Sequence, residues 1–153
     1  MIRVGPLRKE EIPDFVRLVN TVFDEYVGGD YSEEGIRTFK EYTDPEALGA
    51  RFAGESNFYA AKENGIITGA LEIRNMNHIA LFFVDKKHQG RGVGGQLFDF
   101  YLSRLAKPGK IADVTVNASL YAGKIYEALG FRKTGEVQEK NGIKYIPMKF
   151  EIR

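Results

Sequence analysis

The sequence contains no cysteine and only two histidines, His78 and His88. The lack of cysteine excludes disulfide bonds, thiolate metal sites and cysteine nucleophiles. Two histidines are too few for a histidine-rich metal centre, so we expect no bound metal. Any chemistry that the chain performs must therefore use other side chains.

The chain also lacks a strong excess of charge and a long apolar run. It has 22 Lys and Arg residues against 21 Asp and Glu residues, a formal net charge of +1. A general nucleic-acid-binding protein normally carries a basic face, so this balance argues against one. No apolar run approaches the length of a membrane span, and the first residues lack the features of a signal peptide. We expect no nucleic-acid or membrane partner, and a cytoplasmic location.

What the chain does have is enough apolar residues for one folded domain over residues 1–153, since 43% of them are hydrophobic. Residues 1–4 predict a short strand. Apolar residues recur every three or four positions from Ile12 to Tyr26, which predicts an amphipathic helix. A second helix is predicted from Ser32 toward Tyr42, and a third, short helix after the break at Asp44-Pro45 up to Phe52.

Strand patterns begin at residue 58. Strands are predicted at 58–62 and 66–74, joined by an Asn64-Gly65 hairpin turn, and at 78–84. The last of these is almost entirely apolar, which predicts a central strand covered on both faces. The pattern then predicts a helix from Gly92 to Ala106, a strand from Ile111 to Val116, a helix from Ala118 to Leu129, and a hairpin of strands Phe131–Val137 and Lys144–Ile152. This order predicts a mixed α/β (α+β) fold, with a central sheet of about seven strands flanked by helices, and not a regularly alternating doubly wound fold.

A glycine-rich segment, HQGRGVGGQL, occupies residues 88–97. Gly90, Gly92 and Gly95 satisfy the dinucleotide pattern G-x-G-x-x-G. Small residues let backbone amides approach an anion closely, and a predicted helix begins here, with its N-terminus aimed at such a group. Arg91 can add a charge-assisted hydrogen bond to a phosphate. The segment therefore predicts a phosphate-binding loop.

The surroundings of this loop argue against a nicotinamide or flavin dinucleotide. Residues 85–89 separate the glycines from the preceding strand, and two antiparallel strands precede that strand. The acid nearest to the ribose-binding position, Asp113, begins the next strand and does not end it. A Walker loop is excluded because no Gly-Lys-Ser/Thr follows.

The glycine segment has a second interpretation. Residues 89–94, QGRGVG, resemble the Q/R-x-x-G-x-G/A signature of the GNAT acetyltransferase superfamily. Val84-Asp85 resembles the usual end of that family's fourth strand. Downstream, residues 117–119 begin the second familiar segment, and residues 126–131, YEALGF, resemble its Y-E-x-L-G-F ending. The two motifs in this order are far more specific than either alone. The resemblance extends over the whole chain and implies an acyl-CoA N-acyltransferase fold, mostly antiparallel, with a splay between strands four and five.

The resemblance implies direct transfer of an acetyl group from acetyl-CoA, as co-substrate, to a primary amine. The alternative is a non-catalytic acyl-CoA-binding module that acts through a partner. The acceptor stays open among polyamines, amino acids, aminoglycosides and protein amines, and homodimers are frequent in the family. An acidic group could attract a cationic amine or could simply be solvated; it comprises Asp24, Glu25, Asp30, Glu33 and Glu34.

Coenzyme contacts are implied at the end of the fourth strand, in the glycine loop and beside the last helix. Asn117 also suits a helix cap, and Tyr121 lies on a bulkier helix face, with Ile125 and Leu129, that suits the core. Lys86-Lys87 could meet the 3′-phosphate or be merely exposed, and Gly95 is expected to serve helix packing. The implied contacts are Phe82, Phe83, Val84, Gln89, Gly90, Arg91, Gly92, Val93, Gly94, Asn117 and Tyr121.

Two proton transfers need side chains. Tyr126 matches the family's tyrosine acid, which protonates the departing thiolate; Ala118 and Ala122 share its predicted helix face and leave room for a coenzyme tail. A packed aromatic residue is the alternative. His78, eleven residues before Gln89, stands where histone acetyltransferases of this superfamily carry a glutamate base. A histidine can act as base near neutral pH. Glu72 on the neighbouring strand competes for this role, as does a water relay.

Overall fold

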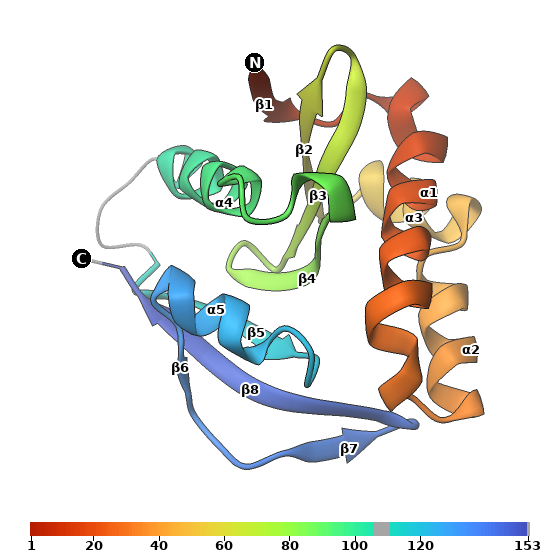
Figure 1. Ribbon diagram of the computed structural model, residues 1–153, viewed down its shortest axis with the longest axis vertical. Coiled ribbons are helices and arrows are strands. Elements are labelled where there is room, and N and C mark those ends of the chain that lie inside the picture. Colours follow the sequence, from red (N-terminus) through yellow and green to blue (C-terminus); the bar gives the residue numbers. More distant parts are fainter. Residues whose placement is uncertain (106–110, 153) are drawn as a thin grey trace.

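The computed structural model describes residues 1–105 and 111–152 (Figure 1). Within them eight strands form one mixed, mostly antiparallel sheet, in the order β1-β2-β3-β4-β5-β8-β6, with β7 paired to β8. The predicted fold class is confirmed. The strands are β1 (Ile2–Pro6), β2 (Asn57–Glu63), β3 (Ile66–Arg74), β4 (His78–Val84), β5 (Asp113–Ala118), β6 (Arg132–Lys133), β7 (Gln138–Lys140) and β8 (Ile143–Glu151). The α-helices are α1 (Ile12–Val22), α2 (Glu33–Tyr42), α3 (Pro45–Phe52), α4 (Val93–Arg104) and α5 (Gly123–Leu129).

The first three helices follow from their sequence signals. The amphipathic stretch from Ile12 forms α1 and continues as a π-helical turn over Phe23–Val27. Ser32 caps α2 by accepting a hydrogen bond from the Gly35 amide, and Asp44 caps α3 in the same way. These three helices pack on one face of the sheet, and α4 and α5 pack on the other (Figure 1). None of the helices in the described ranges is long and apolar enough to cross a membrane.

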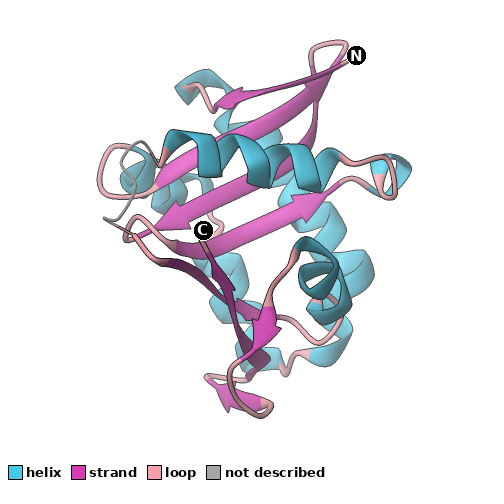
Figure 2. Ribbon diagram, turned by 90° about the vertical axis from the view of Figure 1, so that its left-hand side faces the viewer, coloured by secondary structure: helices cyan, strands magenta, loops and turns pink. Residues whose placement is uncertain are grey.

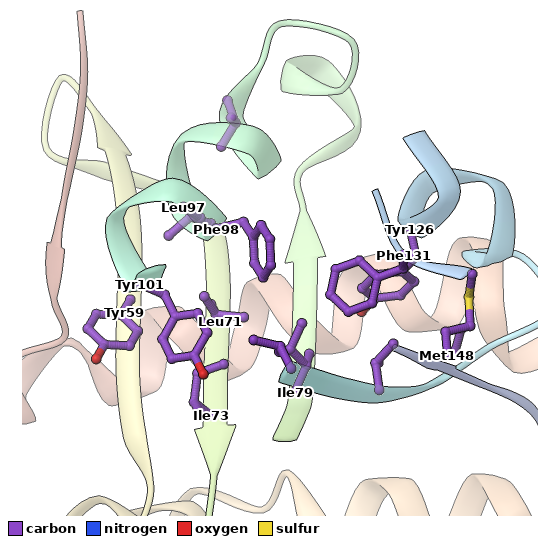
Figure 3. Packing of buried hydrophobic residues seen from close by; sticks show 14 of the residues in the cluster. Tyr59, Leu71, Ile73, Ile79, Leu97, Phe98, Tyr101, Tyr126, Phe131 and Met148 are labelled. Carbon is purple, nitrogen blue, oxygen red and sulfur yellow. The ribbon is translucent and has the colours of Figure 1, made fainter. Parts of the chain in front are cut away.

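The sheet separates two apolar cores. Beneath α4 and α5, Leu97, Phe98 and Tyr101 pack with Tyr126 and Phe131 over the inner strands (Figure 3). Beneath α1 and α2 a second core forms around residues such as Phe15, Val19, Phe23, Phe39 and Leu48. Both layers hold β4 in the middle of the molecule.

Helix α4 lies close to the sheet because of Gly69 on β3. A Cβ atom at Gly69 would lie 2.8 Å from Leu97 Cδ1 and 2.9 Å from Val93 Cγ1. The prediction that Gly95 serves helix packing is wrong, because a Cβ atom there would have no neighbour within 4 Å. Gly69 therefore has the packing role that the sequence assigned to Gly95.

We expect Gly69→Ala to lower the free energy of unfolding by about 1–3 kcal/mol, because the added methyl group would overpack the space beneath α4. The matched control is Gly49→Ala in the interior of α3, where a Cβ atom would meet nothing within 4 Å. Alanine there should leave stability unchanged or raise it by about 0.5–1 kcal/mol. Urea unfolding of both variants measures the difference, and equal stabilities would contradict the packing role.

The predicted splay between strands four and five is confirmed. Parallel pairing of β4 with β5 is limited to His78–Thr115 and Ile79–Val116. At the same point β4 carries a bulge at Ala80, since Ile79 pairs with Ile73 but Leu81 pairs with Glu72. Beyond the bulge the two strands separate. Figure 2 shows the C-terminal strands inclined steeply to the long strands above them.

The prediction that β4 is a central strand covered on both faces is confirmed, because Ile79 and Phe82 pack in the core beneath α4 and α5, and Leu81 and Phe83 pack in the core beneath α1 and α2. The separation from β5 opens one edge of the strand. Phe82, Phe83 and Val84 are only partly buried, because the space beside this end of the strand is open and not filled by β5. The apolar sequence of the strand thus reflects a cavity wall as much as a core.

Two further expectations about boundaries need correction. Of the predicted strand Phe131–Val137 only Arg132–Lys133 forms a strand, β6, and β7 begins after its predicted end, at Gln138. Thr134 donates its N–H to the Pro147 carbonyl on β8, but Pro147 has no N–H to return, so the ladder stops there. Ala118 ends β5, and α5 begins only at Gly123. The predicted end of the preceding helix, Ala106, lies outside the described residues.

Candidate active site

A cavity of about 970 Å³ opens where β4 and β5 part. Its walls come from both faces of the sheet: the glycine turn, α4 and α5 on one side, and α1, α2 and the β7–β8 hairpin on the other. The cavity therefore extends into the gap in the sheet and is lined by elements of both faces. In the described part of the chain, no group of three or more His, Asp or Glu residues is placed to hold a metal ion.

The glycine turn prepares one end of this cavity for an anion. Gly90 and Gly92 have φ values of +78° and +82°, in the left-handed region that glycine adopts without strain. Gly92 precedes the first turn of α4, whose amides at residues 93–95 have no backbone partner among the described residues. Gly95 lines the cavity and leaves open space beside it. Unpaired amides at a helix N-terminus are suited to a phosphate group.

Gln89 holds this turn against the rest of the site. Its side-chain Nε2 donates a hydrogen bond to the Val84 carbonyl at 3.0 Å, and its Oε1 accepts one from the Tyr121 hydroxyl at 3.3 Å. A glutamine can make both bonds because its amide is donor and acceptor at once. The side chain thus ties the turn to the end of β4 and to the segment before α5.

The basic residues near the turn are placed differently from expectation. Arg91 does not line the cavity; its guanidinium lies 3.7 Å from the Glu63 carboxylate. Lys86 forms an exposed ion pair with Glu25 at 3.0 Å. The contacts of Arg91 and Lys86 with phosphate groups of the coenzyme stay predictions.

The exposed edge of β4 offers backbone hydrogen bonds to the cavity. Asp85 donates its N–H to the Thr68 carbonyl, so Asp85 and Phe83 direct their backbone groups toward β3. Because strand residues alternate, Phe82 and Val84 direct theirs into the gap. Val84 has its carbonyl occupied by Gln89, which leaves the N–H and C=O of Phe82 for an extended partner.

Tyr126 lies on the inner side of α5. Its ring packs edge-on against Phe82 and Phe131, with centroids 5.9 and 5.2 Å away. The residue lines the cavity, and its hydroxyl group has no hydrogen-bond partner among the described residues. Burial raises the pKa of the phenol well above its usual value, and nearby Tyr31 adds to the effect, so the group stays protonated at neutral pH.

The geometry of α5 corrects the two helix faces expected from sequence. Ala118 is not on the helix at all, and of the residues predicted for the core face Ile125 is 48% exposed. Tyr121 lies at the cavity wall, between the Gln89 side chain and a stacked Tyr26 ring. The inward position belongs to Tyr126, because its ring completes the core beneath α5.

Asn117 lines the cavity but caps no helix. It lies in β5 opposite Pro147, well before the first residue of α5. The N-cap position of α5 is Ala122, and its amide donates a hydrogen bond to Ser119 Oγ at 3.2 Å in the turn before the helix. The helix-cap interpretation of Asn117 is therefore wrong, and its amide is exposed at the gap between β4 and β5.

His78 lies at the cavity wall beside the last paired residues of β4 and β5. Its Nδ1 is 2.8 Å from the Thr115 hydroxyl. Burial lowers the pKa of the imidazole below its usual 6.5, and the positive charge of Arg74 lowers it further. The ring is therefore neutral near pH 7 and able to accept a proton.

Glu72 is fully buried and does not line the cavity. Its Oε2 accepts hydrogen bonds from Arg51 Nε at 2.8 Å and from the Tyr42 hydroxyl at 3.1 Å, and its Oε1 accepts one from Arg51 Nη2 at 3.2 Å. Both oxygens are thus engaged with neighbours. This arrangement favours a structural role over that of a base.

The wall on the α2 side contains residues that the sequence did not identify. Arg74 is the clearest case. It pairs directly with His78 at the end of the β3–β4 hairpin, and counting residues on both sides of the connection between these two strands could have found it. The other residues come from separate elements, and no sequence pattern links them. They are Tyr31, Thr38, Tyr42, Lys140 and Tyr145.

Three comparisons with known proteins agree on one family. A family model described as "Acetyltransferase (GNAT) domain" matches residues 27–152. The "Uncharacterized N-acetyltransferase in pepI 3′region" of Lactobacillus delbrueckii subsp. lactis is 27% identical over 112 residues, and the match covers 65% of each chain.

Solved structures show the same fold. A protein of Rhodopseudomonas palustris described as a GCN5-related N-acetyltransferase has a TM-score of 0.82 and 23% identity, covering 98% of this chain and 95% of that one. The PaiA N-acetyltransferase of Thermoplasma acidophilum, solved in complex with coenzyme A, has a TM-score of 0.76 and 17% identity, covering 99% of both chains.

Proposed function

Because this chain belongs to the GNAT acetyltransferase family, we propose that it transfers the acetyl group of acetyl-CoA directly to a primary amine. One observation carries the proposal: the cavity extends into the β4–β5 gap, with unpaired amides at one end and Tyr126 and His78 near the gap. A structural relative solved with coenzyme A supports the choice of co-substrate.

Residues at different positions along β4 contact different parts of the coenzyme. The amides of the first turn of α4 hold the pyrophosphate, which the helix dipole also favours. The backbone of Phe82 pairs with the pantetheine arm in the manner of an added strand. Asn117 contributes a polar side chain from β5 across the gap. The bulge at Ala80 marks the position of the thioester, where the strands part.

Acetyl-CoA, when bound, supplies an activated acyl group with a thiolate leaving group. The cavity holds this group against the amine, and such positioning can lower a barrier by roughly 7–11 kcal/mol in favourable cases. Tyr126, protonated and exposed to the cavity, donates a proton to the departing sulfur. No protein nucleophile is required, in keeping with a chain that has no cysteine.

His78 is the proposed base that removes the proton from the attacking amine. If it acts so, kcat/KM should fall as the pH drops through the pKa of His78, and the midpoint should lie below 6.5 because burial favours the neutral ring. In His78→Gln we expect this acid limb to disappear and kcat/KM to fall by about 10²-fold or more. His88→Gln, which removes the only other histidine, should keep the limb. A limb that persists in His78→Gln would favour a water relay.

The test of the function is release of free coenzyme A from acetyl-CoA in the presence of a panel of primary amines, followed with a thiol reagent. We expect release that depends on both acetyl-CoA and an amine. Tight binding of acetyl-CoA with no release for any amine would favour a non-catalytic acyl-CoA-binding module.

A further inference from the structure

The charged residues that line the cavity are of one sign. Arg74, from β3, and Lys140, from β7, line it, beside His88 and the neutral His78. None of the 21 Asp and Glu residues of the chain lines it, and all of them lie in the described part. A site for a polyamine or an aminoglycoside needs carboxylates to balance several positive charges. This lining has the opposite character.

The acidic residues near the first two helices do not change this conclusion. Asp24 is paired with Lys40 at 2.6 Å, and Glu25 with Lys86 at 3.0 Å, both at exposed positions. None of the five residues of that group lines the cavity. Their charges are met by neighbouring lysines and solvent.

Arg74 forms no ion pair within residues 1–105 and 111–152. It is exposed at the end of β3, and no carboxylate among the described residues lies within 4.0 Å of its guanidinium. Glu72 shares its face of the sheet, since strand residues two apart point the same way, but both Glu72 oxygens are held by Arg51 and Tyr42. The charge of Arg74 is therefore available to a ligand.

The position of Arg74 separates it from the coenzyme phosphates. It lies directly opposite His78, so the two Cβ atoms are about 5 Å apart on one face of the sheet. Val84 and the glycine turn lie at the other end of β4, roughly 20 Å along the strand. Arg74 is thus beside the proposed base and remote from the pyrophosphate cradle.

We propose that the acceptor is an amine that carries a carboxylate group, of the α-amino-acid class, and that Arg74 binds the carboxylate. This inference rests on the proposed function and names its substrate class. The planar guanidinium binds a carboxylate through two parallel hydrogen bonds, while the neighbouring amine lies toward His78 and the gap. Lys140 adds positive potential from the β7 wall.

The test compares free amino acids with their carboxamides as acceptors in the coenzyme A release assay. We expect kcat/KM for the acids to exceed that for the matching amides by about 10- to 100-fold, the range of a charge-assisted pair. Spermidine and kanamycin should be poor acceptors. Acceptance of these polycations in preference to amino acids would overturn the inference and leave the acetyltransferase function intact.

The variant Arg74→Gln should abolish the preference for acids over amides, and Arg74→Lys should restore part of it. The control is Arg3→Gln, an exposed arginine on β1 at the far edge of the sheet, which should keep the preference. A second measurement does not depend on turnover: calorimetric binding of N-acetyl amino acids and their amides to the protein with coenzyme A present. The wild-type protein should bind the acids more tightly than the amides, and Arg74→Gln should bind both equally. If the wild-type protein binds acids and amides with the same affinity, the inference is refuted. A preference without any acetyl transfer would instead refute the proposed function.

Discussion

Replacing Tyr126 with phenylalanine is expected to lower kcat by about 10²- to 10⁴-fold, the usual contribution of a general acid. The Kd for acetyl-CoA should stay close to that of the wild type, because the proposed binding groups are backbone amides and not the phenol. The phenol has a raised pKa and so keeps its proton across the neutral range. The loss should therefore appear at every pH between 6 and 9.

The substitution of Tyr126 by phenylalanine should leave the surrounding structure undisturbed. The Tyr126 hydroxyl has no hydrogen-bond partner among the described residues, so its removal breaks no internal bond, and the ring keeps its packing against Phe82 and Phe131. The matched control is Tyr59→Phe, a buried tyrosine on β2 that packs beneath α4 and does not line the cavity. Steady-state kinetics with thiol detection and calorimetric titration of acetyl-CoA measure the two quantities. Unchanged kcat in Tyr126→Phe would remove the residue from the mechanism.

The sequence predicted the N-terminal part of the fold, up to Val84, well. The helix from Ile12, the Ser32 cap, the Asn64-Gly65 turn and the three strands up to Val84 were all local patterns, and the structure confirms each. The C-terminal part was harder to predict, because the points at which its strands end depend on residues of the neighbouring strands. The interruption after Lys133 comes from a missing N–H at Pro147, on a strand more than ten residues away.

The candidate site was predictable where motifs are contiguous. The glycine turn and Tyr126, which line the cavity, belong to motifs whose residues follow one another along the chain, so the sequence alone suggests them. Arg74 was missed because its relevance appears only when the β3–β4 register sets it opposite His78. The environment of Glu72 was hidden for the same reason: the sequence places it on the strand next to His78 but does not reveal its ion pair with Arg51 from α3.

Replacing Glu72 with glutamine should therefore act on stability and not on chemistry. The change leaves the Arg51 guanidinium, only 20% exposed, without a counter-charge. Breaking a buried ion pair by removing one partner costs about 3–5 kcal/mol, and the residual exposure of Arg51 places the expected loss near 3 kcal/mol. For a chain of this length that loss lowers Tm by about 6–12 °C. Thermal unfolding followed by circular dichroism measures it.

A double variant tests whether the ion pair is the cause. Arg51→Leu with Glu72→Leu removes both charges and fills the space with apolar groups, so it should be more stable than either single variant. A double variant less stable than both would mean that the Tyr42 hydroxyl, left without an acceptor, matters more than the charges.

Activity separates this structural role from the alternative role as base. Below the Tm of the variant, Glu72→Gln should keep kcat near the wild-type value, because the carboxylate does not line the cavity. Glu11→Gln is the control. Like Glu72, Glu11 is a buried carboxylate in an ion pair, here with Lys62, and it does not line the cavity. Both variants should lose stability and retain turnover. A fall in kcat confined to Glu72→Gln, at a temperature where both are folded, would instead place the Glu72 carboxylate in the proton path from the amine.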